Sequence, residues 1–521
     1  MTPTATHSAL DRKIAALAER DLPLAIEILK EAIRIPADWV DRPADQGGDP
    51  SCGLSNHEGP RLDYLRRRMV EIRAVAHPDD LGYDAFGNLE WSVEDPNDGI
   101  PRAQKRVIYL DGHCDTVRAL RDAWHAKTGG LDPYLGLVDL AKVNRGYLRS
   151  ELGWLPPDAE WDHVLFGRGS ADQLGGVVSQ IMASRILVEL LPEGAMRGAI
   201  LRGYITVAEE DNDGGGPLYI TRRLLPGAPP DMIPDVVILT DSTGDSKKGA
   251  LGIYRGQRGR MQIEVVVTGR SCHGSMPWEG LNPLEYGAAI LVEAAKAYGG
   301  GEGFRTHDFL GPGTRTASWA HLETPSDCAV PDRFTFRFDR RLTVGETPEQ
   351  SVKDVESLPA VAAARAAGLT VAVGVPTYEQ TTWRGFVPGN PQVYMGWMTP
   401  EDHDAIHAAV AAWRAVVTPH VDETHEQGGS LRREPRVDRW VFSTDGVGWP
   451  VPSGSHGIAV GPRKKWVDAG AFTHPAMFGI GTGIEQNTHK IGEALDTREL
   501  RHAIAFIARF PGAYVAQAGL D

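Results

Sequence analysis

A histidine and an aspartate stand two residues apart at the end of an apolar run, VIYLDGHCDTV, which spans residues 107–117. The run has the composition of a buried strand. Side chains alternate between the two faces of a strand, so His113 and Asp115 point the same way. In parallel α/β sheets, ligands bind at the carboxyl ends of the strands. Taken alone, the pair is more typical of a polar turn, but with further ligand-type side chains nearby it indicates a metal ligand and the group that orients it.

Four further segments carry side chains that can bind metal ions, and each lies at a predicted strand end or in a turn. Together they add carboxylates and a second imidazole but no thiolate, a donor set that suits borderline divalent metals. The segments are GRGSADQLGG with Asp172, VAEEDNDGGG with Glu209 and Glu210, LTDST with Asp241, and EQNTHKIGEALD with His489. Because one carboxylate can bridge two ions, the set predicts a metal site with room for a pair.

The two adjacent glutamates are expected to differ in role. Neighbouring side chains on a strand point to opposite faces, unless the strand has already ended in a turn. One glutamate is therefore expected to bind metal, while the other faces the water at the metals. Asp115 is expected to fix the tautomer of His113.

These side chains need a sheet whose strands end side by side. The runs RVIYLDGH, GAILRGYITVAEED and PDVVILTDST are predicted strands, and GGVVSQIMASRILVELL is a predicted helix. Such alternation predicts an α/β fold, with a large mixed, mostly parallel sheet flanked by helices. Further sheet segments are expected in DRWVFSTDG and HGIAVGP, near residues 438–462.

Between Gly259 and Pro376 the pattern changes to β-α-β-β-α-β, the order of a ferredoxin-like unit. Its second helix is expected over residues 347–367. A chain of 521 residues is too long for one core, so two domains are expected. We predict a catalytic domain in two parts, 1–258 and 377–521, with an inserted lid or dimerisation domain over 259–376. The stretches 41–60, 118–163 and 463–486 look like insertions or binding loops.

The composition excludes several classes of partner. The net charge of −15 argues against nucleic acid and anionic membranes, and no apolar stretch approaches the roughly 20 residues of a membrane span. The N-terminus is charged throughout and is expected to form an amphipathic helix rather than a signal peptide. Four scattered cysteines, Cys52, Cys114, Cys272 and Cys328, form no C-x-x-C pair. This usage fits a reducing, cytoplasmic location.

The motif order resembles that of the M20 metallopeptidases, a family of dinuclear metal hydrolases that includes carboxypeptidases, aminoacylases and succinyl-diaminopimelate desuccinylases. The resemblance covers nearly the whole chain and is weakest in the three insertions. Its branch is similar to putative selenium-metabolism hydrolases and related deacylases. The signal lies in GIYRGQRGRMQIEVVVTGRSCHGSMPWEGLNPLEY, FDRRLTVGETPE and WVFSTDGV.

The resemblance implies a role for each site residue. His113 and Asp241 would hold one divalent ion, Glu210 and His489 the other, and Asp172 would bridge them. Zinc is the expected metal, with manganese and cobalt as alternatives. Glu209 would be the general base. His273, in SCHGS, would stabilise the oxyanion, often in the active site of a dimer partner. The implied assembly is a homodimer through the inserted domain.

Substrate-binding residues also follow from the resemblance. Arg341, in DRRLTVGE, would grip a substrate carboxylate, with Arg340 and Arg333 as nearby candidates. Ser443 and Asp445, in FSTDG, would line the pocket, although the related branch more often has asparagine at the position of Asp445.

The predicted function is hydrolysis of an amide-type C–N bond in a small, carboxylate-bearing substrate such as an N-acyl amino acid or a dipeptide. A second interpretation keeps the metal site but makes the protein an aminohydrolase that acts on an aromatic amine or an amidine carbon. Trp124, Trp154 and Trp161 would then suit a flat substrate, although packing within the insertion explains them equally well. A third interpretation is a non-catalytic binding protein of the same fold.

Overall fold

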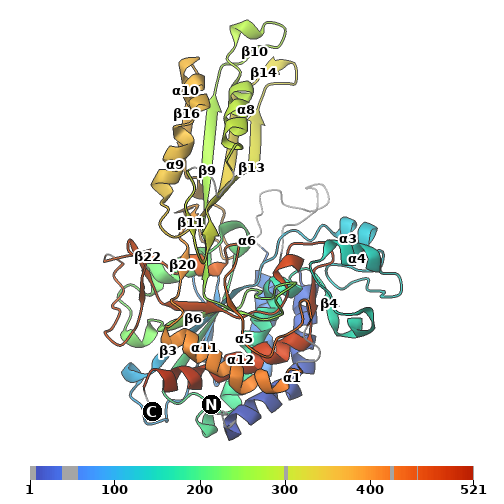
Figure 1. Cartoon of the computed structure of the whole chain (residues 1–521), viewed down its shortest axis with the longest axis vertical. Helices are drawn as coiled ribbons and strands as arrows, with labels where there is room; N and C mark the ends of the chain where they lie inside the picture. Colours follow the sequence, from blue (N-terminus) through green and yellow to red (C-terminus); the bar gives the residue numbers. More distant parts are fainter. Residues whose placement is uncertain (1–7, 38–56, 298–302, 423–426, 455, 520–521) are drawn as a thin grey trace.

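Two sheets organise the chain in the computed structural model (Figure 1). The structure describes residues 8–37, 57–297, 303–422, 427–454 and 456–519. A broad lower part contains an eight-stranded sheet, and a long arm rises from it with a five-stranded sheet. Among the described residues, no helix is both long and apolar enough to cross a membrane.

The eight-stranded sheet is mixed, with order β1-β2-β5-β3-β6-β25-β7-β21. Its central strands β5, β3, β6 and β25 run parallel to one another. The α/β class expected from the sequence is confirmed. The strands are β1 (Leu81–Tyr83), β2 (Leu89–Glu94), β3 (Arg106–His113), β5 (Ala199–Thr206), β6 (Val236–Leu239), β7 (Ile253–Tyr254), β21 (Val437–Asp438) and β25 (Ala476–Gly479).

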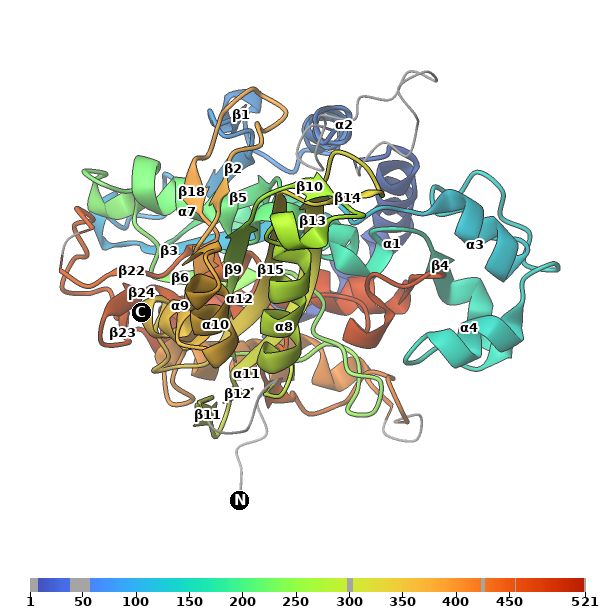
Figure 2. The same ribbon diagram turned by 90° about the horizontal axis from the view of Figure 1, so that it is seen from above.

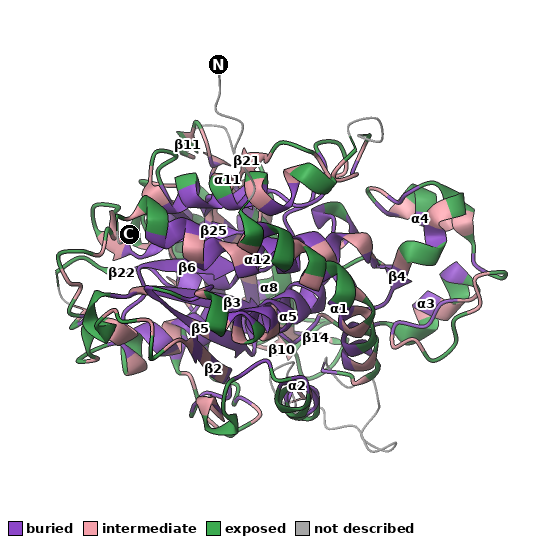
Figure 3. Ribbon diagram, turned by 90° about the horizontal axis from the view of Figure 1, so that it is seen from below, coloured by how far each residue is buried: buried purple, intermediate pink, exposed green. Residues whose placement is uncertain are grey.

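Helices cover this sheet because its strands are apolar on both faces. Ile108 and Leu110 of β3 join one core cluster, while Val107 and Tyr109 join another on the opposite side. The first cluster packs under four helices: α1 (Ala9–Arg34), α5 (Gly175–Glu189), α11 (Asp404–Val416) and α12 (Arg498–Gln517). Figure 3 shows buried residues along α5, which packs against β3 and also against α1 and α12.

The arm is an antiparallel sheet of order β13-β15-β9-β16, with β19 paired to β9. Alternate residues of β9 are buried against helices on one face only. The order along the chain is the expected β-α-β-β-α-β. The elements are β9 (Gly259–Thr268), α8 (Pro283–Ala294), β13 (Thr314–Glu323), β15 (Arg333–Leu342), α9 (Pro348–Glu356), α10 (Pro359–Ala366), β16 (Thr370–Gly374) and β19 (Val393–Tyr394).

Three local expectations were wrong in whole or in part. The single helix expected over residues 347–367 is broken into α9 and α10, because Pro359 forces Leu358 into an extended conformation. The run HGIAVGP forms no strand, since Gly457 has a left-handed φ of 70°. In DRWVFSTDG only Asp438 belongs to a strand, β21.

The segment 118–163, here called the insertion, forms a small lobe beside the eight-stranded sheet (Figure 2). It contains α3 (Arg121–Thr128) and α4 (Arg145–Glu151) and leads into β4 (Val164–Phe166). Trp124 and Trp161 are buried in the lobe's own core and are packing residues, whereas Trp154 is half-buried.

The other two predicted insertions are the segments 41–60 and 463–486. Most of 41–60 lies outside the described residues, and α2 (Gly59–Glu71) begins at its end. The stretch 463–486 is an insertion only in part, because it includes β25, a central strand of the eight-stranded sheet. Before β25 it forms β23 (Val467–Asp468) and β24 (Phe472–His474), which make a small sheet with β22 (Val451–Pro452).

The remaining elements are short. They are β8 (Gly256–Gln257), β10 (Cys272–His273), β11 (Thr306–His307), β12 (Gly311–Pro312), β14 (Ala329–Val330), β17 (Thr377–Tyr378), β18 (Asn390–Pro391), β20 (Trp397–Met398), β26 (Ala494–Asp496), α6 (Glu209–Asn212) and α7 (Gly215–Tyr219).

Candidate metal centre

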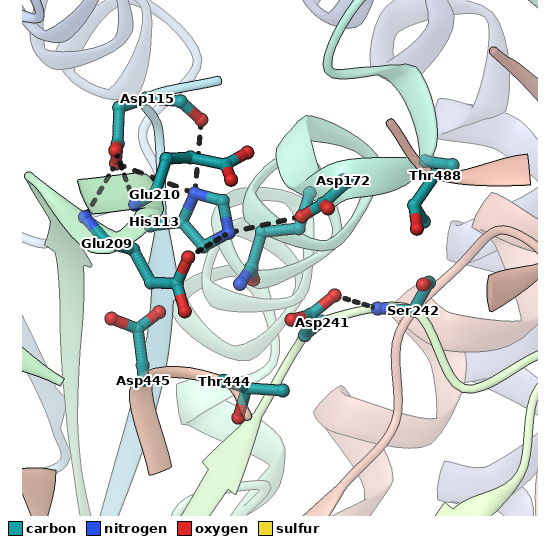
Figure 4. Close-up of polar contacts among 12 residues, drawn as sticks. His113, Asp115, Asp172, Glu209, Glu210, Asp241, Ser242, Thr444, Asp445 and Thr488 are labelled. Atoms are coloured by element: carbon teal, nitrogen blue, oxygen red, sulfur yellow. Dashed lines mark hydrogen bonds and ion pairs between the residues drawn. The ribbon is translucent and has the colours of Figure 1, made fainter. Parts of the chain in front are cut away.

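Three of the predicted site loops meet because their strands are neighbours. Strand β3 lies between β5 and β6, and all three run parallel, so their carboxyl ends share one edge. His113 is the last residue of β3, Glu209 begins the turn after β5, and Asp241 lies two residues beyond β6. The sheet therefore brings the side chains of these loops together (Figure 4).

Asp172 and His489 reach the same place from two other loops. Strand β4 pairs antiparallel with β26, which draws the loop after β4 toward the loop before β26. The buried carboxylate of Glu493 accepts hydrogen bonds from the backbone N–H of Asp172 at 3.1 Å and of Ala171 at 3.0 Å. It also pairs with the Arg168 guanidinium at 2.6 Å. One residue of the His489 loop thus fixes the backbone of Asp172.

The ligand atoms form two groups that share Asp172. One group is His113, Asp172 and Asp241, and the other is Asp172, Glu210 and His489; within each, the atoms lie within 4.8 Å of one another. Asp172 Oδ1 is 3.2 Å from His113 Nε2, whereas Oδ2 is 3.1 Å from His489 Nε2. His489 Nε2 is also 3.1 Å from Glu210 Oε2. Each oxygen of Asp172 therefore faces a different imidazole, as a bridging carboxylate requires.

The surroundings of His113 suit a metal ligand. Its Nδ1 is 3.1 Å from the carbonyl oxygen of Asp115, which favours a proton on Nδ1 and leaves the Nε2 lone pair free. Nε2 is buried and makes no hydrogen bond with any described residue, despite its nearness to Asp172. A buried, unbonded ring nitrogen among carboxylates fits a coordinated ion.

Asp115 acts on both sides of the site. Its carboxylate accepts hydrogen bonds from the backbone N–H groups of Glu209 at 3.2 Å and Glu210 at 2.9 Å. Its Oδ1 is 3.5 Å from His113 Nδ1, farther than its own carbonyl oxygen. Asp115 therefore orients the imidazole through its backbone and the two glutamates through its side chain.

Negative charge accumulates at the centre. Burial, and after it the charge of Asp172, raises the pKa of Asp241 well above its ordinary value. Burial also raises the pKa of Glu209, where Asp445 and Glu210 add to the effect and His113 opposes it. Buried carboxylates gathered in this way are costly unless cations offset their charge. The residues present thus fit a pair of divalent cations.

Comparison with known proteins identifies a matching family model, related sequences and similar structures. Residues 255–366 match the model of a peptidase dimerisation domain. YgeY, an uncharacterized protein of Escherichia coli (strain K12), is 33% identical over 363 residues, 69% of this chain and 74% of that protein. A succinyl-diaminopimelate desuccinylase of Dechloromonas aromatica (strain RCB) is 28% identical over 188 residues, 36% of this chain and 47% of that protein. The solved structure of Bacillus subtilis YXEP, titled a dinuclear metal binding peptidase from M20 family, has a TM-score of 0.53 at 12% identity, covering 96% of this chain and 98% of that one.

The dimerisation-domain match, together with a relative 33% identical over most of both chains, decides the family. The chain belongs to the M20 family. It is a hydrolytic enzyme, and the predictions of family and enzyme class are confirmed. The two ligand groups support divalent metal ions.

In this M20 enzyme, His273 lies far from the metal centre. It belongs to β10, which pairs with β14 at the outer end of the arm (Figure 1). The ten residues of β9 run between the two regions, and at about 3.3 Å per residue they span roughly 30 Å. His273 is exposed, and its Nδ1 is 2.8 Å from the Ser275 hydroxyl oxygen. The single chain does not bring His273 to its own metal ligands.

Arg341 lies at the opposite end of the arm, beside the turn that carries Glu209 and Glu210. Its Nε and Nη2 donate to the two oxygens of Asp339 at 2.7 and 3.1 Å, and its Nη1 donates to Ser443 Oγ at 2.8 Å. Ser443 Oγ in turn donates to Asp213 at 2.6 Å, three residues after Glu210. A chain of hydrogen bonds therefore joins the base of the arm to the turn that carries both glutamates.

The two other candidate arginines lie elsewhere. Arg340 is buried and paired with Glu346 at 2.7 Å, and Arg333 faces Glu323 at 3.7 Å toward the outer end of β15. Of the three, Arg341 is the one that is both half-buried and hydrogen-bonded to the metal side of the molecule.

Asp445 is buried behind the metal centre. Figure 4 shows its carboxylate beside that of Glu209, and its Oδ1 accepts a hydrogen bond from the Thr206 hydroxyl at 3.1 Å. Its other oxygen makes no hydrogen bond with any residue in the described part of the chain. Asp445 therefore acts on the electrostatics of Glu209 from a position closed to solvent.

Sequence reasoning missed the residues that hold the ligand loops. Glu493 and Arg168 form a buried ion pair between the Asp172 and His489 loops. Glu58 accepts a hydrogen bond from the backbone N–H of Ala208, whose φ is +62°, just before Glu209. Glu493 lies four residues after His489, and Arg168 lies four before Asp172. A charged residue this close to a ligand is the one signal that could have marked them.

Proposed function

We propose that the protein is a dinuclear metal-dependent hydrolase that cleaves an amide-type C–N bond in a small, carboxylate-bearing substrate. The single observation that carries this proposal is the sharing of Asp172 between two ligand groups, with Glu209 beside them. A binding protein has no need of an unligated carboxylate directed at a paired metal site.

In the proposed centre, His113 and Asp241 would hold one ion, Glu210 and His489 would hold the other, and Asp172 would contact both. We propose zinc, with manganese or cobalt as alternatives, because the donors are imidazole nitrogens and carboxylate oxygens. When bound, two such ions supply Lewis acidity that polarises a carbonyl and acidifies water.

Glu209 is the proposed general base. It belongs to neither ligand group, yet its Oε2 lies 3.7 Å from His113 Nε2, next to where the ions would bind. Burial raises its pKa, so its carboxylate accepts a proton more readily than an exposed one. It takes a proton from the attacking water and delivers it to the leaving nitrogen. The hydrogen bond from its backbone to Asp115 holds it in place.

His273 is proposed to act in a second subunit. The arm matches a dimerisation domain, and His273 at its outer end is remote from the metal centre of its own chain. In a homodimer with twofold symmetry, each arm could place one His273 at its partner's centre. There the imidazole would donate a hydrogen bond to the oxygen that becomes negative as the carbonyl is attacked.

Arg341 is the proposed contact for the substrate carboxylate, and Ser443 and Asp445 are proposed to shape the pocket. The support is position: Arg341 is hydrogen-bonded through Ser443 to the loop that follows Glu210. Of the three tryptophans that suit a flat substrate, Trp124 and Trp161 are buried and Trp154 alone is half-buried, which leaves the aminohydrolase alternative weakly supported.

A substrate screen tests the proposal. The purified protein, stripped of metal and reloaded with Zn²⁺, is assayed against N-acyl amino acids, dipeptides and aromatic amines. We expect hydrolysis of amide substrates that requires two ions per chain. Turnover of aromatic amines alone would favour an aminohydrolase, and no turnover of any class would favour a binding protein.

A further inference from the structure

The loop that carries His489 lies along the insertion. From Asn487 to Thr497 the chain makes contacts with residues 148–166, on both sides of the ligand. Strand β26 pairs with β4 directly after the insertion, and the Thr497 hydroxyl donates to the carbonyl oxygen of His163 at 2.8 Å. The loop is therefore attached to a lobe that lies beside the sheet carrying the other ligands.

Asn487 makes the contact before the ligand. Its Oδ1 accepts hydrogen bonds from the backbone N–H groups of Gly153 at 2.8 Å and Trp154 at 3.3 Å, and its Nδ2 donates to the carbonyl oxygen of Trp154 at 2.8 Å. Asn487 is buried, so these bonds are shielded from water. One side chain thus docks the loop onto the insertion two residues before His489.

Leu148 makes the contact after the ligand. Gly492 has a φ of +90°, and a Cβ added there would lie 2.3 Å from Leu148 Cδ2, so the leucine packs directly on the glycine backbone. Leu148 is fully buried in the core of the lobe. Lys490 and Glu151 add an exposed ion pair at 3.1 Å. The insertion therefore contacts the loop on each side of His489.

His489 needs this support more than His113 does. His113 ends a buried central strand, whereas the His489 side chain is 54% exposed and its backbone has a left-handed φ of +60°. Such a conformation in a residue other than glycine persists only where its surroundings impose it. The groups that orient a ligand commonly change metal affinity by 10–100-fold.

We propose that the insertion is a clamp that positions His489 for one of the two metal ions, with Asn487 and Leu148 as its positioning residues. The proposal rests on the proposed metal centre. It predicts an asymmetry: the ion held by Glu210 and His489 depends on the insertion, and the ion held by His113 and Asp241 does not.

Calorimetric titration of the metal-free protein with Zn²⁺ tests the clamp. In Asn487→Ala and in Leu148→Ala, we expect one of two binding events to weaken by about 10–100-fold while the other keeps its affinity. Circular dichroism and thermal unfolding should show both variants folded. Leu148→Met fills a similar volume and should keep both events.

Gln486→Ala is the matched control. Gln486 is the neighbour of Asn487, but its side-chain amide bonds to Ser246 and Asp245 outside the insertion. Its Cβ, which packs against Gly153, is kept in alanine. The variant should keep both affinities, so equal weakening in Gln486→Ala would overturn the proposal. So would weakening of both events together, unfolding of both clamp variants, or unchanged binding in both.

His489→Ala distinguishes failure of the proposed metal centre from failure of the clamp. It should lose one event outright if His489 is a ligand. Retention of both events in His489→Ala contradicts the proposed metal centre itself. Loss in His489→Ala with normal binding in Asn487→Ala and Leu148→Ala overturns the clamp alone.

Discussion

The metal centre and the outer end of the arm are built in opposite ways. At the centre, Asp115 and Glu493 hold the backbone of ligand residues with hydrogen bonds in a buried setting. At the arm's end, the imidazole of His273 is exposed and bonds only to nearby Ser275 among the described residues, and Trp278 close by is 76% exposed. The difference supports the proposal that one chain completes the metal centre, whereas the arm's end acts against another surface.

The largest effect is expected from Asp172→Ala. Because Asp172 alone belongs to both ligand groups, its removal should abolish the paired site and with it detectable turnover. Elemental analysis and Zn²⁺ titration measure the loss. Two ions bound with unchanged affinity would mean that Asp172 is not the bridge.

Glu209→Gln should separate chemistry from metal binding. We expect two ions per chain and a fall in kcat of about 10²–10⁴-fold, the usual contribution of a general acid–base group. Glu210→Gln is the matched control, since it alters the adjacent residue, which is a proposed ligand, and should lose an ion. If Glu209→Gln lost an ion and Glu210→Gln kept both, the roles assigned to the two glutamates would be exchanged.

His273→Ala tests the exposed region. The variant should fold and bind both ions, with kcat lower by roughly 10²–10³-fold from the loss of one oxyanion donor. Ser275→Ala removes only its local partner and is expected to act far more weakly. Full activity of His273→Ala would show that His273 takes no part in catalysis.

The smallest effect is expected at the base of the arm. Arg341→Lys keeps the charge but loses the two-pronged geometry, so KM for a carboxylate-bearing substrate should rise roughly tenfold with little change in kcat. The same substrate with its carboxylate amidated should show no change. Equal effects on both substrates would assign Arg341 to the structure of the arm.

The same contrast explains what the sequence could predict. His113, Glu209 and Asp241 were predicted from the sequence because each stands at the end of a predicted strand. The carboxyl ends of parallel strands share one edge of a sheet. Asn487 and Glu493 were not predicted, since their partners lie more than 300 residues away in the loops around the insertion. Pro359 shows a local signal that was present but overlooked: a proline that begins a second helix.

Mixed dimers test the central claim most directly, that the metal centre works within one chain and His273 across two. His273→Ala and Glu209→Gln subunits, each nearly inactive alone, are mixed and allowed to exchange. In a hybrid dimer, one of the two sites regains both groups. With random exchange about half of the dimers are hybrids, so activity should recover to about one quarter of wild type. A mixture no more active than the mean of its two components would contradict the account.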